Sequence, residues 1–394
     1  MVINLFDDNA WSSLRPLTFT RPVGSLRLGI LTIAEKWAKR WNTEAGFFTQ
    51  NYLARKFGVK KAPEMLMING SVLPDEPLAD AVSALRPGEA LFAADVLIAL
   101  IISESDLSDF HPSQTSAYRP LQFSGEISRI VFPEQLFSMN AAELEKDFNL
   151  HTSGRSSAGI SSTNTLIGDR FFAEEGAVAE CATFNTLNGP VYLGRDAQVW
   201  EGANIRGGFS LGEKSGVKMG AKIYGATTIG PNCRVGGEIK NVVMYGNSNK
   251  GHEGYLGDSI VGEWCNFGAD TNNSNMKNNY SSVRIWSYET STYRDTGMQF
   301  CGLIMADHAK SGINTMFNTG TVVGVSANVF GGGYPPKFVP DFAWGGSEGF
   351  CGYLPDRMIE TAQRVFTRQN AVLGQTEQSI LHHIFEQTQH FRNF

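Results

Sequence analysis

The chain has 394 residues, a formal net charge of −6 and 42 glycines, most of them in the middle and C-terminal thirds. This length suffices for two or three domains, and the negative charge argues against a general nucleic-acid binder. Five cysteines without a C-x-x-C pair indicate neither a zinc site nor a disulfide framework. No apolar run approaches a membrane span, and the acidic Asp7 and Asp8 follow the first apolar residues too soon for a signal peptide. We therefore expect a cytoplasmic protein.

Residues 1–150 alternate between strand-like and helix-like segments, which predicts an α/β, Rossmann-like domain with an open, largely parallel sheet. Short apolar runs are typical of buried strands, and apolar residues at helical spacing indicate helices. The predicted strands are Val2–Phe6, Met65–Ile68 and Leu91–Ile102, and the predicted helices are Leu28–Trp41 and Ala141–Phe148. Residues 151–165, rich in Ser, Thr and Gly, form the predicted linker.

An aliphatic residue then returns at every sixth position, in a series that we call the aliphatic ladder. A period of six fits a coil with three flat sides and one inward aliphatic per side, which stacks on its counterpart eighteen residues away. The sequence therefore predicts a left-handed parallel β-helix of hexapeptide repeats over residues 166–340. The ladder consists of Leu187, Leu193, Val199, Ile205, Leu211, Val217, Ile223, Ile229 and Val235.

The period of six fails in two places, and the chain ends in a segment of another kind. Gly237–Asp258 is predicted to be rich in loops, and Asn272–Tyr280 is a second break, before sixes resume from Met305 to Val329. Loops can leave a solenoid without destroying its stack, so functional residues are expected at such breaks. Residues 341–394 form a predicted helical extension, a cap or an oligomer contact, over Asp356–Leu373 and Glu377–Phe391.

Polar residues are unusually dense in and around these breaks. Each has an ordinary structural explanation alone: lysines are usually solvated, and asparagines in β-helix coils commonly satisfy turn backbones. Their joint spacing is more specific than any single member. The residues that carry it are Lys240, His252, Tyr255, Asn266 and Asn275.

This spacing resembles the acetyltransferase domain of the GlmU family, bifunctional bacterial enzymes that make UDP-N-acetylglucosamine. The string His252-x-x-Tyr255-Leu-Gly-Asp, a Lys twelve residues before it and Asn eleven and twenty residues after the Tyr all match. The resemblance implies acetyl transfer from acetyl-CoA to an amino-sugar 1-phosphate. His252 would then be the general base, because a protonated amine cannot attack a thioester. It also implies that Asn275 orients the amine or the thioester oxygen, and that the site forms between the β-helices of a homotrimer. The implied substrate-binding residues are Lys222, Lys240, Tyr255 and Asn266.

The N-terminal segment Leu14–Pro22 is similar to the signature of sugar-phosphate nucleotidyltransferases, whose domain order also matches. The phosphate-binding glycine loop of that family is replaced here by Asp7–Ser12, and its metal-binding Gly-Asp by Asn69-Gly70-Ser71. The resemblance implies UTP or dTTP as substrate, with Mg²⁺ if this domain is active. The implied nucleotide-binding residues are Arg15, Arg21 and Arg27, and the implied metal ligands are Asp7, Asp8 and Asp75.

Two other functions remain open on the sequence. The chain could be a sugar-1-phosphate nucleotidyltransferase whose β-helix serves only for trimerisation. It could also be a catalytically silent scaffold that binds a nucleotide sugar. A decayed N-terminal domain and a rearranged, active one are both compatible with the altered glycine loop.

Overall fold

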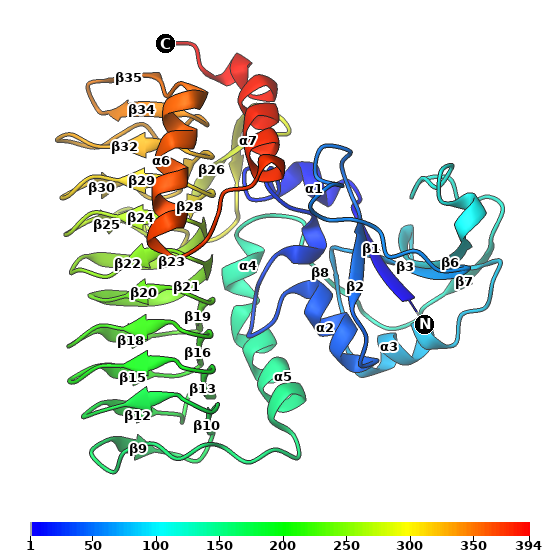
Figure 1. The fold of residues 1–394 in the computed structure, drawn as a ribbon, viewed down its shortest axis with the longest axis horizontal. Coiled ribbons are helices and arrows are strands. Elements are labelled where there is room, and N and C mark those ends of the chain that lie inside the picture. The colour runs from blue at the N-terminus through cyan, green and yellow to red at the C-terminus, as the bar shows by residue number, and fades with distance from the viewer. Residues whose placement is uncertain (1) are drawn as a thin grey trace. The chain divides into compact units, whose positions relative to one another are not determined.

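The computed structural model describes residues 2–394, whose contacts divide into two compact units (Figure 1). The first unit holds the chain up to Leu26 and residues Leu31–Phe132, and the second holds Arg27–Ile30 and Pro133–Phe394. Each unit has its own cluster of buried hydrophobic residues. Both therefore meet the ordinary description of a domain.

The first unit is built on a six-stranded sheet with the strand order β2-β1-β3-β6-β5-β7. Its α/β class is confirmed, and β1 and β3 cover the predicted runs Val2–Phe6 and Met65–Ile68. The strands of this unit are β1 (Val2–Phe6), β2 (Ala45–Phe48), β3 (Glu64–Asn69), β4 (Val72–Leu73), β5 (Glu89–Ala93), β6 (Val96–Ser103), β7 (Arg119–Gln122) and β8 (Ser128–Arg129). Its helices are α1 (Ala10–Ser13), η1 (Val23–Ser25), α2 (Ile33–Arg40), α3 (Glu76–Ser83) and η2 (Glu104–Asp106).

Two details of this unit differ from the prediction. The run Leu91–Ile102 forms two antiparallel strands, β5 and β6, because the chain reverses at Ala94, whose φ of 50° suits a tight turn. Since β6 also pairs antiparallel with β3, the sheet is mixed rather than largely parallel. Helix α2 begins only at Ile33, because the Thr32 hydroxyl caps it by accepting a hydrogen bond from the Glu35 amide.

The second unit is a parallel β-helix with three faces, which confirms the predicted solenoid. Strands on the first and second faces belong to one sheet, and strands on the third face to another. The first face holds β9 (Thr165–Ile167), β12 (Thr183–Asn185), β15 (Asn204–Arg206) and β18 (Lys222–Tyr224). The second holds β10 (Phe171–Ala173), β13 (Val191–Leu193), β16 (Phe209–Leu211), β19 (Thr227–Ile229), β28 (Leu303–Met305), β31 (Thr321–Val323) and β33 (Phe338–Val339). The third holds β11 (Val178–Ala179), β14 (Gln198–Val199), β17 (Gly216–Val217), β20 (Arg234–Val235), β22 (Asn249–Lys250), β24 (Asn266–Phe267), β29 (Lys310–Ser311), β32 (Asn328–Val329), β34 (Ala343–Gly346) and β35 (Gly349–Gly352).

The segment Gly237–Asp258 is not a set of loops, so that prediction was wrong. It contributes two nine-residue strands, β21 (Glu238–Gly246) and β23 (Tyr255–Glu263), each of which spans the first and second faces. The coils themselves are shorter here. Val217 pairs with Val235, eighteen positions on, whereas Val235 pairs with Lys250, only fifteen positions on. The period of six is lost because corner residues are missing, while the stacking of the coils continues.

The second break is a long excursion from the β-helix. Val261 pairs with Met305, forty-four positions on, so this coil carries an insertion. The insertion contains an antiparallel hairpin, and the first residues of the predicted break form a short strand that pairs with the next coil. The strands concerned are β25 (Asn272–Asn273), β26 (Arg284–Ser287), β27 (Thr292–Asp295) and β30 (Met316–Phe317).

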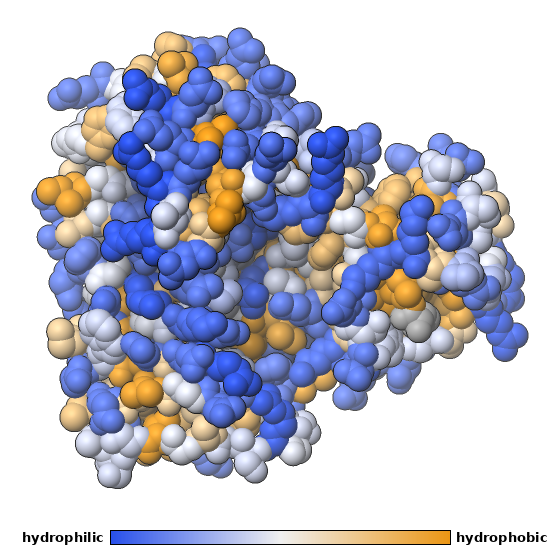
Figure 2. All heavy atoms as spheres, in the orientation of Figure 1, coloured by the Kyte–Doolittle hydropathy of each residue, from blue (hydrophilic) through white to orange (hydrophobic). Residues whose placement is uncertain are grey.

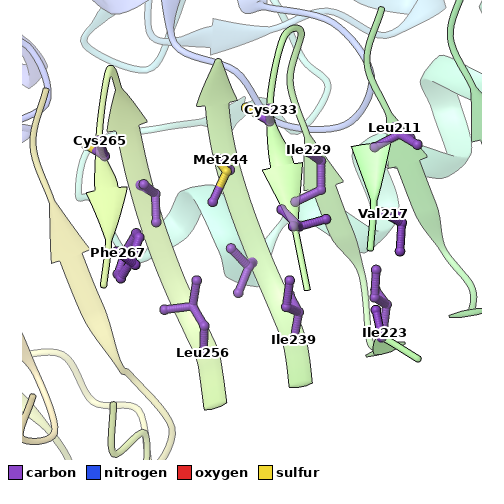
Figure 3. Packing of buried hydrophobic residues seen from close by; sticks show 14 of the residues in the cluster. Leu211, Val217, Ile223, Ile229, Cys233, Ile239, Met244, Leu256, Cys265 and Phe267 are labelled. Carbon is purple, nitrogen blue, oxygen red and sulfur yellow. The ribbon is translucent and has the colours of Figure 1, made fainter. Parts of the chain in front are cut away.

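The core of the β-helix consists of the inward side chains of successive coils, which point into the interior in Figure 3. Eight of the nine ladder residues are at most 2 % exposed, but Leu187 is 71 % exposed. Phe184, which is fully buried, takes the inward position instead and pairs with Ile205. Five residues, 186–190, separate β12 from β13, whereas two residues separate β15 from β16. Leu187, six positions before Leu193, therefore lies in this longer corner and outside the core.

The predicted C-terminal helices are confirmed as α6 (Pro355–Arg368) and α7 (Gln375–Gln387), followed by η3 (Gln389–Phe391). They pack on the β-helix through aromatic rings: Phe366 stacks on Trp264 with 3.8 Å between ring centroids. Two further helices of this unit precede the solenoid, α4 (Gln135–Ser138) and α5 (Asn140–Thr152), and α5 contains the predicted helix. Coil pairing continues through β34, past the predicted boundary at residue 340.

On the face drawn in Figure 2, hydrophobic residues form small, separate patches among hydrophilic ones. No helix within residues 2–394 is both long and apolar enough to span a membrane.

Two leucines of the ladder, six residues apart, test this packing. We expect Leu193→Ala to lower the free energy of unfolding by about 2–5 kcal/mol, because it leaves a cavity in the core. Leu187→Ala is the matched control and should change it by less than about 0.5 kcal/mol, because that side chain is exposed. Chemical denaturation of both variants measures the difference. Equal losses at the two positions would contradict the assignment of Phe184 to the core.

Candidate functional site

The first face of the β-helix carries two columns of outward polar residues. Because alternate residues of a strand point to opposite sides, the inward Ile223, Ile239 and Leu256 leave their neighbours pointing outward. The pairing aligns Lys222, Glu238 and Tyr255 in one column, and Tyr224, Lys240 and Gly257 in the next. Two predicted substrate lysines and the predicted tyrosine therefore share one face.

Asn275 connects this face to the insertion. Its amide Nδ2 donates to the Tyr255 hydroxyl at 2.8 Å and to a carboxylate oxygen of Asp258 at 2.5 Å. Asn241 donates to the other oxygen of Asp258 at 2.8 Å. Both Nδ2 hydrogens of Asn275 are thereby used, which leaves its carbonyl oxygen as the group that can meet a ligand.

Lys240 is held between a carboxylate and an aromatic ring. Its Nζ lies 3.9 Å from the Asp258 carboxylate and 4.7 Å from the centroid of the Phe300 ring, and both groups attract an ammonium group. Phe300 and Asp258 were not assigned roles from the sequence. Asp258 is the last residue of the motif His252-x-x-Tyr255-Leu-Gly-Asp. No pattern in the sequence near Phe300 indicates that the insertion brings this residue next to Lys240.

Both tyrosines of the first face stay neutral at physiological pH. A hydrogen bond to Glu238 and burial together raise the pKa of Tyr224 to about 12. Burial, followed by the nearby negative charge of Asp258, raises the pKa of Tyr255 well above its usual range. Tyr224 already donates its only hydroxyl hydrogen to Glu238, whereas Tyr255 accepts from Asn275 and can still donate to a sugar or phosphate oxygen.

His252 lies in the corner that joins the third face to the first. Its side chain is exposed, and the next residue, Glu253, places a carboxylate oxygen 3.6 Å from Lys222 Nζ. Gly254 follows with a φ of 115°, and a β-carbon at this position would lie 2.2 Å from the Thr271 carbonyl oxygen. Only glycine fits there, so this backbone fixes how the corner enters β23.

Asn266 is the one predicted residue of the acetyltransferase set that lies elsewhere. It belongs to β24 on the third face, with an exposed side chain, and pairs with Asn249. Lys222, Lys240, Tyr255 and Asn275 are brought together, but within a single chain Asn266 lies on a different face from them.

The predicted metal ligands of the N-terminal unit do not form one group. Asp7 and Asp8 follow β1, at the carboxyl edge of the sheet, but Asp75 instead caps α3 by accepting a hydrogen bond from the Leu78 amide. Asp8 is engaged by Arg129, whose Nη2 lies 2.5 Å from its Oδ2, and by the Asn69 amide at 2.9 Å. Within residues 2–394, no three His, Cys, Asp or Glu side chains are grouped as a metal site.

With these contacts in place the carboxylates do not fit Mg²⁺. Both oxygens of Asp8 accept hydrogen bonds, from Arg129, Asn69 and the Ala10 amide, and a guanidinium occupies the place that a cation would take. Asp7 is likewise engaged by the Val23 amide and the Thr49 hydroxyl.

The three predicted nucleotide-binding arginines have different surroundings. The guanidinium group of Arg15 lies 5.6 Å and 5.7 Å from two aromatic ring centroids, and Arg21 is 7 % exposed. Arg27 donates to the Ile30 carbonyl and belongs to the short segment counted with the second unit. Arg129, which contacts Asp8, was missed because it lies 121 residues away in the sequence.

Comparisons with known proteins show similarity to sugar nucleotidyl transferases and to bifunctional GlmU proteins. Residues 3–156 match a family model described as sugar nucleotidyl transferase. The bifunctional protein GlmU of Methanocaldococcus jannaschii is 34% identical over 87 residues, which cover 22% of this chain and 21% of that protein. GlmU of Synechococcus elongatus is 26% identical over 165 residues, covering 40% of this chain and 32% of the relative.

A bifunctional sugar-1-phosphate nucleotidylyltransferase/acetyltransferase of Sulfurisphaera tokodaii is 27% identical over 148 residues, covering 37% of this chain and 36% of that protein. The aligned part of the chain thus spans between about a fifth and about a third of the curated relatives named here. Among solved structures, an Arabidopsis UDP-N-acetylglucosamine acyltransferase matches with 14% identity and a TM-score of 0.28, over 59% of this chain and 89% of that one. The chain is therefore GlmU-like in sequence.

The carboxyl group of Asp7 gives the N-terminal unit a pH-dependent stability. Burial raises the pKa of Asp7 to about 7. Between about pH 4 and pH 7 the folded state therefore keeps a proton that the unfolded state releases, and stability falls as the pH rises. We expect Asp7→Asn to abolish the loss of stability that the titration of Asp7 causes between pH 5 and pH 8. The unfolding midpoint at the two pH values measures this loss. Asp75→Asn, which keeps a good helix cap, is the control and should leave the fall unchanged. A wild-type slope in Asp7→Asn would contradict the prediction.

Proposed function

We propose that this GlmU-like chain is a transferase that moves the acetyl group of acetyl-CoA to the amine of an amino-sugar 1-phosphate similar to glucosamine-1-phosphate. The observation that carries the proposal is the cluster on the first face, where Lys240, Tyr255, Asp258 and Asn275 contact one another next to the corner that bears His252. A cation, a neutral phenol and an amide carbonyl suit a phosphate, sugar hydroxyl groups and an amine, respectively.

His252 is the general base of the proposed reaction. Imidazole accepts a proton near neutral pH, and the exposed position of His252 leaves its ring accessible to a substrate. The sugar amine attacks the thioester carbonyl carbon, a C–N bond forms and the C–S bond breaks. The proton lost by the amine passes to His252 and then to the CoA thiolate, so the products are the N-acetyl sugar phosphate and free CoA.

Lys240 and Lys222 bind the phosphate, and Tyr255 donates to the sugar. Asp258 and Phe300 limit the positions open to the Lys240 ammonium group, which helps a flexible lysine act as a fixed charge. Asn275 has only its carbonyl oxygen free. This supports a role in orienting the N–H of the amine, rather than in donating to the thioester oxygen.

Asn266 supports a site shared between copies of the chain. It lies on the third face, so it can approach a substrate on the first face only if it comes from a neighbouring β-helix. A homotrimer with three equivalent sites between its β-helices meets this condition.

Nucleotidyl transfer from UTP or dTTP to the sugar phosphate is the second candidate function, and the match of residues 3–156 to sugar nucleotidyl transferases favours it. This second candidate includes no step that uses Mg²⁺, because Asp8 is paired with Arg129.

One assay separates the candidates: the protein is incubated with glucosamine-1-phosphate, acetyl-CoA, UTP or dTTP, and Mg²⁺, and the release of free CoA and of pyrophosphate is followed separately. Release of neither product, over a range of amino-sugar phosphates, would leave only the silent scaffold.

His252→Ala is the direct test of the general base. We expect the kcat for CoA release to fall by about 10²–10⁴-fold with little change in stability, because the side chain is exposed. Any pyrophosphate release should persist. His382→Ala, which removes another exposed histidine, is the control and should keep full activity. Acetyl transfer at the wild-type rate in His252→Ala would exclude this residue as the base.

A shared site predicts complementation between two inactive variants. His252→Ala and Asn266→Ala should each be poorly active alone. Their co-expression should restore up to about a quarter of the wild-type activity, because some sites then combine the two intact faces. The assay is CoA release by co-purified, differently tagged chains. Activity no higher than that of the separate variants would indicate that each site is formed within one chain.

A further inference from the structure

Lys250 is a cation at an inward position of the β-helix. The pairing of the third face aligns it with Val235, which in turn pairs with Val217, and all three are at most 2 % exposed. Aliphatic residues occupy this position in the two preceding coils. Charged side chains are rarely buried unless they are paired or hydrogen-bonded, so the contacts of Lys250 indicate what it does there.

Its ammonium group binds the corner that carries His252. Lys250 Nζ donates to the carbonyl oxygen of His252 at 2.6 Å and to that of Glu253 at 3.2 Å. Burial lowers the pKa of Lys250 to about 8, while the carboxylates of Glu253 and Asp270 favour its charged form. The group thus remains mostly charged near neutral pH and holds two peptide groups of one turn.

The unequal lengths of adjacent corners explain why a cation is needed. Two residues, Gly236 and Gly237, separate β20 from β21, whereas four residues, Gly251–Gly254, separate β22 from β23. The longer corner therefore has two more peptide groups than the corner of the preceding coil, so the hydrogen-bonding groups of the two corners cannot all pair with each other. Lys250 supplies a donor from inside the solenoid to the His252 carbonyl group, which would be costly to leave without a partner. It supplies a second donor to the Glu253 carbonyl group, which also accepts from the Asp270 amide.

We propose that Lys250 is a positioning residue, which fixes the Gly251–Gly254 corner from within and thereby sets the position of the His252 imidazole. This inference rests on the proposed role of His252 as the base. Lys250 does not contact substrate. It acts through the backbone of His252 and, through Glu253, on the position of Lys222.

The test compares Lys250→Met with Lys310→Met. Lys310 is the control, because it is a half-buried lysine that also donates to a nearby backbone carbonyl, that of His308 at 2.8 Å, but on a later coil. We expect Lys250→Met to lower kcat by about 10–100-fold, the size of effect that misplacement of a catalytic group by about 1 Å produces. The KM for acetyl-CoA should stay within about twofold, and Lys310→Met should keep kcat within about twofold of the wild type. A similar loss of kcat in both variants, or none in Lys250→Met, would overturn the proposal.

A double variant distinguishes positioning from general damage. If Lys250 acts through His252, Lys250→Met should lower the residual activity little further in a His252→Ala background. A full additional loss there would overturn the proposal. Full activity of His252→Ala itself would instead overturn the proposed function, so the two failures are separable. If Lys250→Met does not fold, Lys250→Gln, whose amide keeps a donor for the corner, takes its place in both experiments with a smaller expected loss.

Discussion

The second unit depends on one constraint: each side of a coil must point one side chain inward, in register with the same side of the next coil. The inward residues are almost fully buried, and their packing supplies the hydrophobic stabilisation that a single coil cannot obtain alone. This constraint fixes the strands but leaves the corners free, because corner residues lie outside the core. Corner length can therefore change from coil to coil, as it does between Val235 and Tyr255.

The proposed site occupies a part of the solenoid where corner length changes. The corners before β21 and β23 differ by two residues, and the next coil carries the insertion that brings Asn275 and Phe300 to the first face. A regular stack provides aligned columns of side chains, and an irregular corner adds one group that can project from it. The site combines both features, because the exposed His252 lies in the corner directly before β23, next to the columns that contain Lys240 and Tyr255. The buried Lys250 donates to the His252 carbonyl group of this corner, which has no equivalent in the shorter corner before it.

The first unit is built on a mixed sheet rather than on stacked coils, and two aspartates follow its strand β1. Asp7 and Asp8 lie where parallel strands end, a common position for ligand sites in α/β sheets. Asp8 is paired with Arg129, whereas burial raises the pKa of Asp7, against the smaller opposite effect of the hydrogen bonds from Thr49 and Val23. The edge thus carries less negative charge than two free carboxylates would.

The sequence by itself determined the β-helix, its inward residues from Leu193 to Val235, the α/β character of the first unit and both C-terminal helices. These follow from periodicity, which reports locally which side of a strand or helix is buried. The resemblance in motif spacing also grouped Lys240, Tyr255 and Asn275, which lie together in the structure around Asp258. Only the tertiary structure decided that Leu187 is exposed, that Gly237–Asp258 forms strands and that Asn266 lies on another face. Arg129 and Phe300 likewise required it. Corner lengths and partners far apart in the sequence set these outcomes, and neither leaves a periodic signal along the chain.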